Sequence, residues 1–171
     1  MPHGKDCGRS LVRQSGGRYP YHFRHVSSSS GCVFHTILVA VDGSPITERV
    51  LAAAADITRQ FESELHCMYV IETGWSEGDA TRELVIRELE EKSGPLLAGF
   101  ERELTRLGVR STLHLKRGHP GEVILTTADE IGADLVVIGS VGKSQISRML
   151  SGSVSTFVVT HSPVATLVIK P

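Results

Sequence analysis

Residues 135–155 read LVVIGSVGKSQISRMLSGSVS, an apolar run followed by a segment rich in glycine and serine. The run Leu135–Ile138 is wholly aliphatic, as is typical of a buried parallel strand. Gly139 and Gly142 follow it directly. Glycine allows backbone angles closed to other residues and lets a ligand approach the main chain closely. This order predicts a buried strand that opens into a phosphate-binding loop.

A second glycine–serine pair, Gly152 and Ser153, follows Gly142 after nine intervening residues. Ser155 and the apolar residues after it predict a helix that begins near Gly152 or Ser153. The first N–H groups of a helix have no acceptor within it, and together with the helix dipole they favour a bound anion by about 0.3–1 kcal/mol. Ser153 and Ser155 would add hydroxyl donors, so we expect phosphate groups at this helix start.

Two better-known phosphate motifs are absent. A P-loop ending in Gly142-Lys143-Ser144 would need a glycine at position 137, which is Val137. A dinucleotide fingerprint would place its glycines in the first strand-to-helix turn, which here contains Asp42 and Gly43. The alternative that remains open is that the glycines after residue 138 only form a loop.

The chain has 171 residues, of which 40% are hydrophobic and 22% charged, as expected for one globular domain. Aromatic residues make up only 5%, which favours an aliphatic core and a parallel sheet covered by helices. The net charge is −1, but residues 1–35 carry five basic side chains and one acidic one, so the remainder carries −5. The folded part therefore has no excess of basic charge, and we expect no nucleic-acid binding.

Residues 1–32 are rich in Gly, Ser, Arg and His and show no apolar periodicity, so we expect a disordered N-terminal tail. The tail has no apolar core of a secretory signal, and no stretch of the chain is long enough to predict a membrane span. Cys7, Cys32 and Cys67 form no CxxC motif and are odd in number. They indicate a reduced, cytoplasmic protein. Because no stretch could span a membrane, we expect no membrane association.

Residues 33–171 alternate between strand-like and helix-like segments and form the predicted domain. A break or kink is expected in the second helix, because Pro95 removes a backbone donor there. The expected strands are 33–41, 64–71, 110–116, 134–138 and 164–169, and the expected helices are 45–61, 79–107, 121–131 and one from about 152. The alternation predicts an α/β fold with a doubly wound, five-stranded parallel sheet in the order 3-2-1-4-5 and helices on both faces.

This strand order makes the first and fourth strands neighbours at the switch point of the sheet. Asp42 and Gly139, at the carboxyl ends of these strands, should therefore converge on one nucleotide-sized site. Alternatively, Asp42 is an ordinary turn residue before Gly43. The strand 164–169 would form an exposed apolar edge, and we expect a homodimer that uses it.

Several motifs resemble the universal stress protein family over residues 33–171. They are VAVDGS at 39–44, YVIE at 69–72, GHPGEVIL at 118–125, ADLVVIGSVG at 133–142, and the pattern G-x2-G-x9-G-S that begins at Gly139. The glycine pattern resembles that of the ATP-binding branch of the family. Val141 stands where members of this branch commonly have histidine or arginine, and the predicted break at Pro95 departs from their continuous helix.

The resemblance implies a set of ligand contacts. Adenine would lie against the backbone of Val70 and beside Ala40 and Val41, with Asp42 near the ribose or a Mg²⁺ ion. Gly139 and Gly142 would contact the ribose and the first phosphate. The outer phosphates would be bound by Gly152, Ser153, Val154 and Ser155.

The leading hypothesis is an ATP-binding stress-response regulator in which ATP, ADP or AMP, with or without Mg²⁺, changes the surface seen by a regulatory protein partner. No paired carboxylates or nucleophile–base set accompany the loop, so no dedicated catalysis is expected. Lys143 and Arg148 leave a slow ATPase or autophosphorylating enzyme as one alternative. A nucleotide-free dimeric interaction module is the other.

Overall fold

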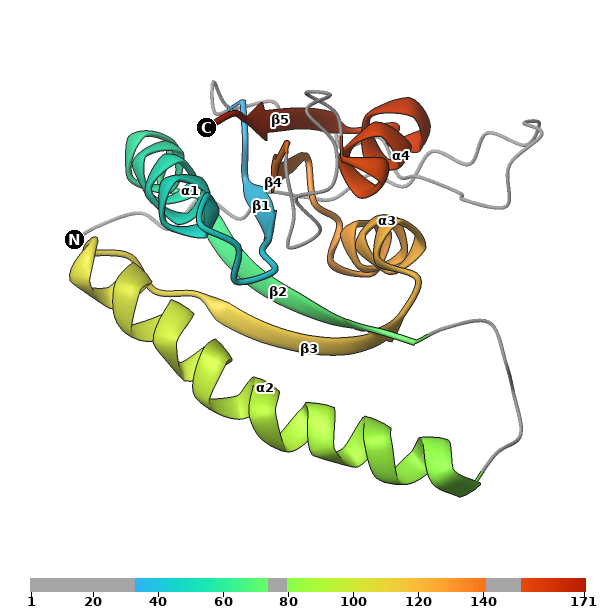
Figure 1. Cartoon of the computed structure of the whole chain (residues 1–171). Coiled ribbons are helices and arrows are strands. Elements are labelled where there is room, and N and C mark those ends of the chain that lie inside the picture. The colour runs from blue at the N-terminus through green and yellow to red at the C-terminus, as the bar shows by residue number, and fades with distance from the viewer. Residues whose placement is uncertain (1–32, 74–79, 141–151) are drawn as a thin grey trace.

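The computed structural model describes residues 33–73, 80–140 and 152–171. Within these ranges five strands alternate with four helices (Figure 1). The strands are β1 (Thr36–Ala40), β2 (Glu64–Glu72), β3 (Thr112–Gly118), β4 (Leu135–Gly139) and β5 (Ala165–Ile169). The helices are α1 (Thr47–Phe61), α2 (Ala80–Arg106), α3 (Pro120–Ile131) and α4 (Ser153–His161).

The strands form one sheet in the order β3-β2-β1-β4-β5, and each neighbouring pair is parallel. The predicted fold class and strand order are therefore confirmed. Ala40, the last residue of β1, lies opposite Met68 of β2 and Ile138 of β4. The carboxyl ends of the three central strands thus meet at one edge of the sheet.

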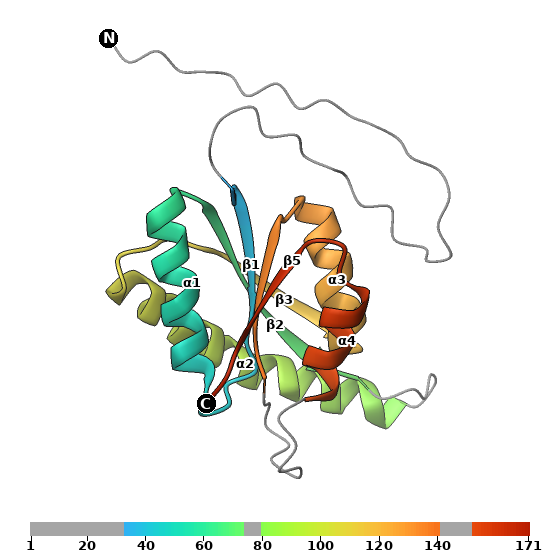
Figure 2. The same cartoon turned by 90° about the horizontal axis from the view of Figure 1, so that it is seen from above.

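Helices cover both faces of the sheet, as Figure 2 shows. Side chains alternate between the faces along each strand, because successive residues of a strand point in opposite directions. Ile37 and Val39 of β1 pack in the core with residues of α1 and α2, whereas Leu38 packs in the core with residues of α3 and α4. Because the central strands β1 and β4 bury both faces, their sequences are almost continuously apolar.

Helix α2 runs without interruption from Ala80 to Arg106 and contains Pro95, so the predicted break is wrong. The Ser93 hydroxyl donates a hydrogen bond to the Leu89 carbonyl, one turn earlier, at 2.6 Å. Beyond the proline, Leu97, Phe100 and Leu104 are buried in the core. Burial of this apolar face outweighs the loss of one backbone donor, and α2 is continuous, as the family resemblance implied.

Candidate functional site

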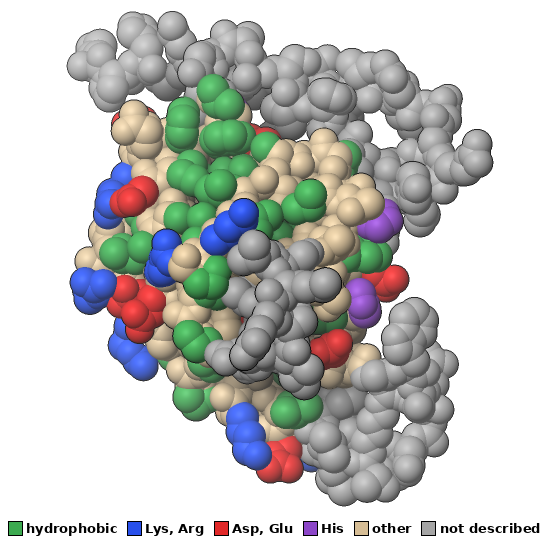
Figure 3. Space-filling view, turned by 45° about the horizontal axis from the view of Figure 1, so that its top comes forward, with side chains coloured by type: hydrophobic (Ala, Val, Ile, Leu, Met, Phe, Trp, Pro, Cys, Tyr) green, Lys and Arg blue, Asp and Glu red, His purple; other side chains and the backbone are tan. Residues whose placement is uncertain are grey.

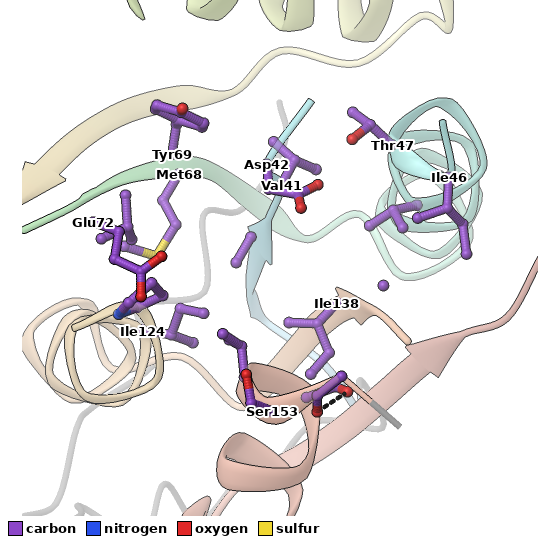
Figure 4. Close-up of a pocket in the computed structure, with 18 residues that line it drawn as sticks. Val41, Asp42, Ile46, Thr47, Met68, Tyr69, Glu72, Ile124, Ile138 and Ser153 are labelled. Carbon is purple, nitrogen blue, oxygen red and sulfur yellow. Dashed lines mark hydrogen bonds between the residues drawn. The ribbon is translucent and has the colours of Figure 1, made fainter. Parts of the chain in front are cut away.

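A cavity of about 400 Å³ opens at the carboxyl edge of the sheet (Figure 4). Its walls come from the ends of three strands and from the first turns of three helices. The lining residues are Ala40, Val41, Asp42, Ile46, Thr47, Val50, Met68, Tyr69, Val70, Glu72, Pro120, Ile124, Ile138, Gly139, Gly152, Ser153, Val154 and Ser155. Such a volume lies within the range of small-molecule sites in proteins.

The predicted convergence of Asp42 and Gly139 is present, because both residues line this cavity. Ala40, Val41, Val70 and residues 152–155 line it as well. Gly142 lies outside the described residues, as do Val141, Lys143 and Arg148. The structure therefore brings together every described residue of the predicted site.

Asp42 also has a local role in the turn between β1 and α1. Its Oδ1 accepts a hydrogen bond from the Ser44 backbone N–H at 3.0 Å, an arrangement that stabilises turns. The N–H of Val41 donates to the Met68 carbonyl at 3.0 Å, which extends the β1–β2 pairing up to the cavity. The turn role and the cavity-lining position of Asp42 are thus compatible.

The first turn of α4 faces the cavity without a side-chain cap. Gly152 is the N-cap residue, and within the described residues no side-chain cap bonds to the first N–H groups of this helix. Residues 153–155 line the cavity, and the N–H groups at the start of a helix have no acceptor within it. This helix start therefore offers donors to a ligand, and no acidic residue lies in its first turn.

Gly152 is held close to the end of β4. Its N–H donates to the Ser140 carbonyl at 2.8 Å, and the Ser140 N–H donates to the Ile169 carbonyl at 2.8 Å. The backbone angles of Gly152, φ −64° and ψ 146°, are open to any residue. A Cβ at this position would, however, lie 3.1 Å from the Ser140 oxygen, so close packing favours glycine here.

The two serines of this turn differ. Ser155 is 6% exposed, and its hydroxyl donates to the Gly152 carbonyl at 2.9 Å. Ser153 is exposed and lines the cavity. Ser153 is therefore placed where a ligand could reach its hydroxyl, whereas the Ser155 proton is already engaged within the helix.

Half of the lining residues were not singled out by the sequence. They are apolar residues and polar ones at element ends: Ile46, Thr47 and Val50 of the α1 segment, Met68, Tyr69 and Glu72 of β2, Pro120 and Ile124 of α3, and Ile138 of β4. The hydroxyl of Thr47 is buried and has no hydrogen-bond partner among the described residues, which fits a site that receives a polar ligand. Ile138 and Glu72 lie at strand ends, and this position was the signal in the sequence that could have identified them as lining residues.

Within residues 33–73, 80–140 and 152–171, no group of three or more His, Cys, Asp or Glu side chains is placed to hold a metal ion. None of the helices in these ranges is both long and apolar enough to cross a membrane.

The Universal stress protein family model matches residues 34–170. A putative universal stress protein of Staphylococcus haemolyticus is 32% identical over 143 residues, which cover 80% of this chain and 85% of that protein.

Two solved structures share the fold. A universal stress protein in complex with cAMP is 22% identical with a TM-score of 0.61, and the match covers 81% of this chain and 98% of that one. The universal stress protein of Archaeoglobus fulgidus in complex with dAMP is 24% identical with a TM-score of 0.56, covering 81% and 99%. By the family match and the staphylococcal relative, the chain belongs to the universal stress protein family.

Proposed function

We propose that the protein binds an adenine nucleotide in the cavity at the carboxyl edge of the sheet. The observation that carries the proposal is the uncapped start of α4 facing the same cavity as Asp42. Backbone N–H groups and a helix dipole favour phosphate at that wall. Relatives with the same fold have been solved with cAMP and with dAMP, which supports an adenine nucleotide as the ligand class.

The walls suggest how the ligand lies. Ala40, Val41 and Val70 provide apolar surface and backbone groups for the base, and Asp42 accepts a hydrogen bond from a ribose hydroxyl. Gly139 lies beneath the sugar and first phosphate, and the turn of residues 152–155 binds the outer phosphates. Gly142, outside the described residues, is assigned to the first phosphate by family resemblance. ATP, ADP and AMP all fit this scheme, and Mg²⁺ would accompany the phosphates near Asp42.

The function best supported is regulation by nucleotide binding, without dedicated catalysis. The titratable side chains among the described lining residues are Asp42, Tyr69 and Glu72. Hydrolysis needs a positioned water or a base beside the phosphates, and the described part of the α4 wall, residues 152–155, contains no acidic or basic side chain. We therefore assign the bound nucleotide to control of a surface that a regulatory protein recognises, in a cytoplasmic stress response.

We also propose a homodimer that uses β5. This strand pairs with β4 on one side only and forms an edge of the sheet. Figure 3, in which the β5 side of Figure 1 comes forward, shows hydrophobic side chains at the surface with Lys, Arg, Asp and Glu mostly around them. Edge strands of this kind are commonly paired or covered in natural proteins.

Calorimetric titration of the purified protein with ATP, ADP, AMP and GTP tests the ligand. We expect heats of binding for the adenine nucleotides and weaker or no binding for GTP. Nucleotide released on heat denaturation and identified by chromatography provides an independent measurement. Absence of any binding at millimolar ATP, together with no released nucleotide, would rule out the proposed function.

A further inference from the structure

Two histidines form a cross-strand pair away from the cavity. His66 of β2 and His114 of β3 lie on the same face of the sheet, with Nδ1 of His66 2.9 Å from Nε2 of His114. Their rings are stacked, with centroids 5.2 Å apart and planes 23° from parallel. His66 is only 8% exposed. The pair therefore joins the edge strand β3 to its single neighbour through a sheltered N–H···N hydrogen bond.

The surrounding charges assign the protons. Nε2 of His66 lies 3.2 Å from the Glu64 carboxylate, so a proton is favoured on that nitrogen. Nδ1 of His66 is then the acceptor, and Nε2 of His114 is the donor. From β3 itself Lys116 faces the pair, and Glu130 of α3 forms an ion pair with Lys116 at 3.2 Å. The neighbouring strand β1 places apolar Leu38 opposite His66.

This bond survives one added proton and fails with two. A single imidazolium still donates to the neutral ring beside it, whereas two imidazolium rings have no acceptor between them and repel each other. The pKa of His114 lies below the ordinary histidine value. Burial lowers it most, the nearby His66 and Lys116 lower it further, and Glu130 raises it. A folded-state pKa below the unfolded one means that stability is highest above about pH 6.5 and falls as the pH drops further.

The same two strands continue to the cavity. Met68 and Val70, two and four residues after His66, line it, and Thr73 donates to the Gly118 carbonyl at 3.4 Å where β3 ends. Pro120, at the start of the following helix, also lines it. We infer that the His66–His114 pair is a pH-sensitive clasp that holds β3 in place near neutral pH. When acid breaks the hydrogen bond between the two rings, the nucleotide site becomes weaker. The second half of this inference rests on the proposed function.

Urea unfolding and ATP titration of the full chain at pH 7.5 and pH 5.0 test the clasp. In the wild type the ratio of folded to unfolded protein should fall about tenfold more between these pH values than in His114→Gln, whose amide still donates to His66 but does not titrate. Between pH 7.5 and pH 5.0 the wild-type Kd for ATP should rise about fivefold more than the Kd of the variant. This factor stays below the tenfold change in the folding equilibrium that we assign to the clasp. His161→Gln is the matched control, because His161 bonds to the Phe157 carbonyl on α4 and should leave the wild-type response unchanged.

Long-range ¹H–¹⁵N spectra of the imidazoles provide a reading that does not depend on unfolding. His66→Gln should raise the titration midpoint of His114, because one of the causes that lower its pKa is removed. Equal pH responses of the wild type and His114→Gln in urea would overturn the clasp, and equal changes in Kd would overturn its link to the site. No ATP binding at pH 7.5 would instead contradict the proposed function, while the urea comparison would still decide on the clasp.

Discussion

The starts of α1 and α4 reach the same cavity from opposite sides of the β1–β4 pair but present different chemistry. The α1 side carries Asp42 in the preceding turn and Glu48 in its first turn, and its first N–H, from Thr47, already donates to the Ser44 carbonyl at 2.9 Å. The α4 side has no acidic residue in its first turn and no side-chain cap. The cavity thus has one wall suited to an anion and another suited to neutral hydroxyl or amino groups, as a nucleotide requires.

Gly152→Val should have the largest effect, because it obstructs the anion-binding wall. The added Cβ would lie 3.1 Å from the Ser140 carbonyl oxygen, and the branched side chain would project from the turn that we assign to phosphate. We expect ATP affinity to fall more than about 100-fold, or about 2.7 kcal/mol, in calorimetry. The Ser140 carbonyl must also give way to the added Cβ, so the melting temperature should fall by a few degrees, about 1 kcal/mol.

Gly99→Ala is the control for that variant. Gly99 lies inside α2, and a Cβ there would meet only Nη2 of Arg102, at 3.9 Å. Alanine should leave ATP affinity unchanged and stabilise the helix by about 0.5–1 kcal/mol. Near-normal ATP binding by Gly152→Val would mean that α4 does not hold the phosphates.

Gly121→Ala should displace the α4 wall without touching the α1 wall. A Cβ on Gly121, in the first turn of α3, would lie 2.5 Å from Cδ1 of Phe157 on α4. We expect a loss of about 1–3 kcal/mol of stability, measured by urea unfolding, and about tenfold weaker ATP binding. Adding Phe157→Leu should restore part of both. If Gly121→Ala weakened the binding of adenosine as much as that of ATP, the assignment of α4 to the phosphates alone would be contradicted.

Asp42→Asn should weaken binding about five- to tenfold, because a neutral amide accepts a ribose hydroxyl less strongly than a carboxylate does. The amide oxygen can still accept the Ser44 N–H, so the turn should persist. The loss should be equal for adenosine, AMP and ATP in parallel titrations. A loss confined to ATP with Mg²⁺ would instead indicate that Asp42 acts through the metal.

Ser153→Ala and Ser155→Ala form the finest test of the α4 wall. Exposed Ser153 can donate to phosphate, so its alanine variant should weaken ATP about three- to fivefold and adenosine not at all. Ser155 already donates to the Gly152 carbonyl, and its alanine variant should lower stability by about 1 kcal/mol with little change in affinity. Equal effects of the two variants on ATP binding would erase this distinction.

The parallel sheet and its order could be predicted because β1 and β4 are aliphatic runs, β3 alternates as an edge strand does, and each crossover has helical periodicity. The convergence of Asp42 and Gly139 at the ends of β1 and β4 was predictable for the same reason, because strand order alone brings these two residues together. The continuity of α2 could not be predicted from local rules, because tertiary burial of Leu97 and Phe100 decides it.

The remaining walls depend on contacts that no local pattern records. Thr47 and Ile124 look like ordinary helix residues in sequence, and only the packing of their helices turns them toward the cavity. His66 and His114 are 48 positions apart, and the β2–β3 register alone makes them partners.

Ser140 connects the α4 wall to the edge of the sheet, because its carbonyl receives Gly152 and its N–H reaches Ile169 at the end of β5. Two hydrogen bonds therefore separate the proposed phosphate turn from the strand proposed to pair with a second copy. Linkage is reciprocal: if nucleotide shifts Gly152 and thereby tightens self-association, then self-association must tighten nucleotide binding by the same factor. The apparent nucleotide affinity would then depend on protein concentration.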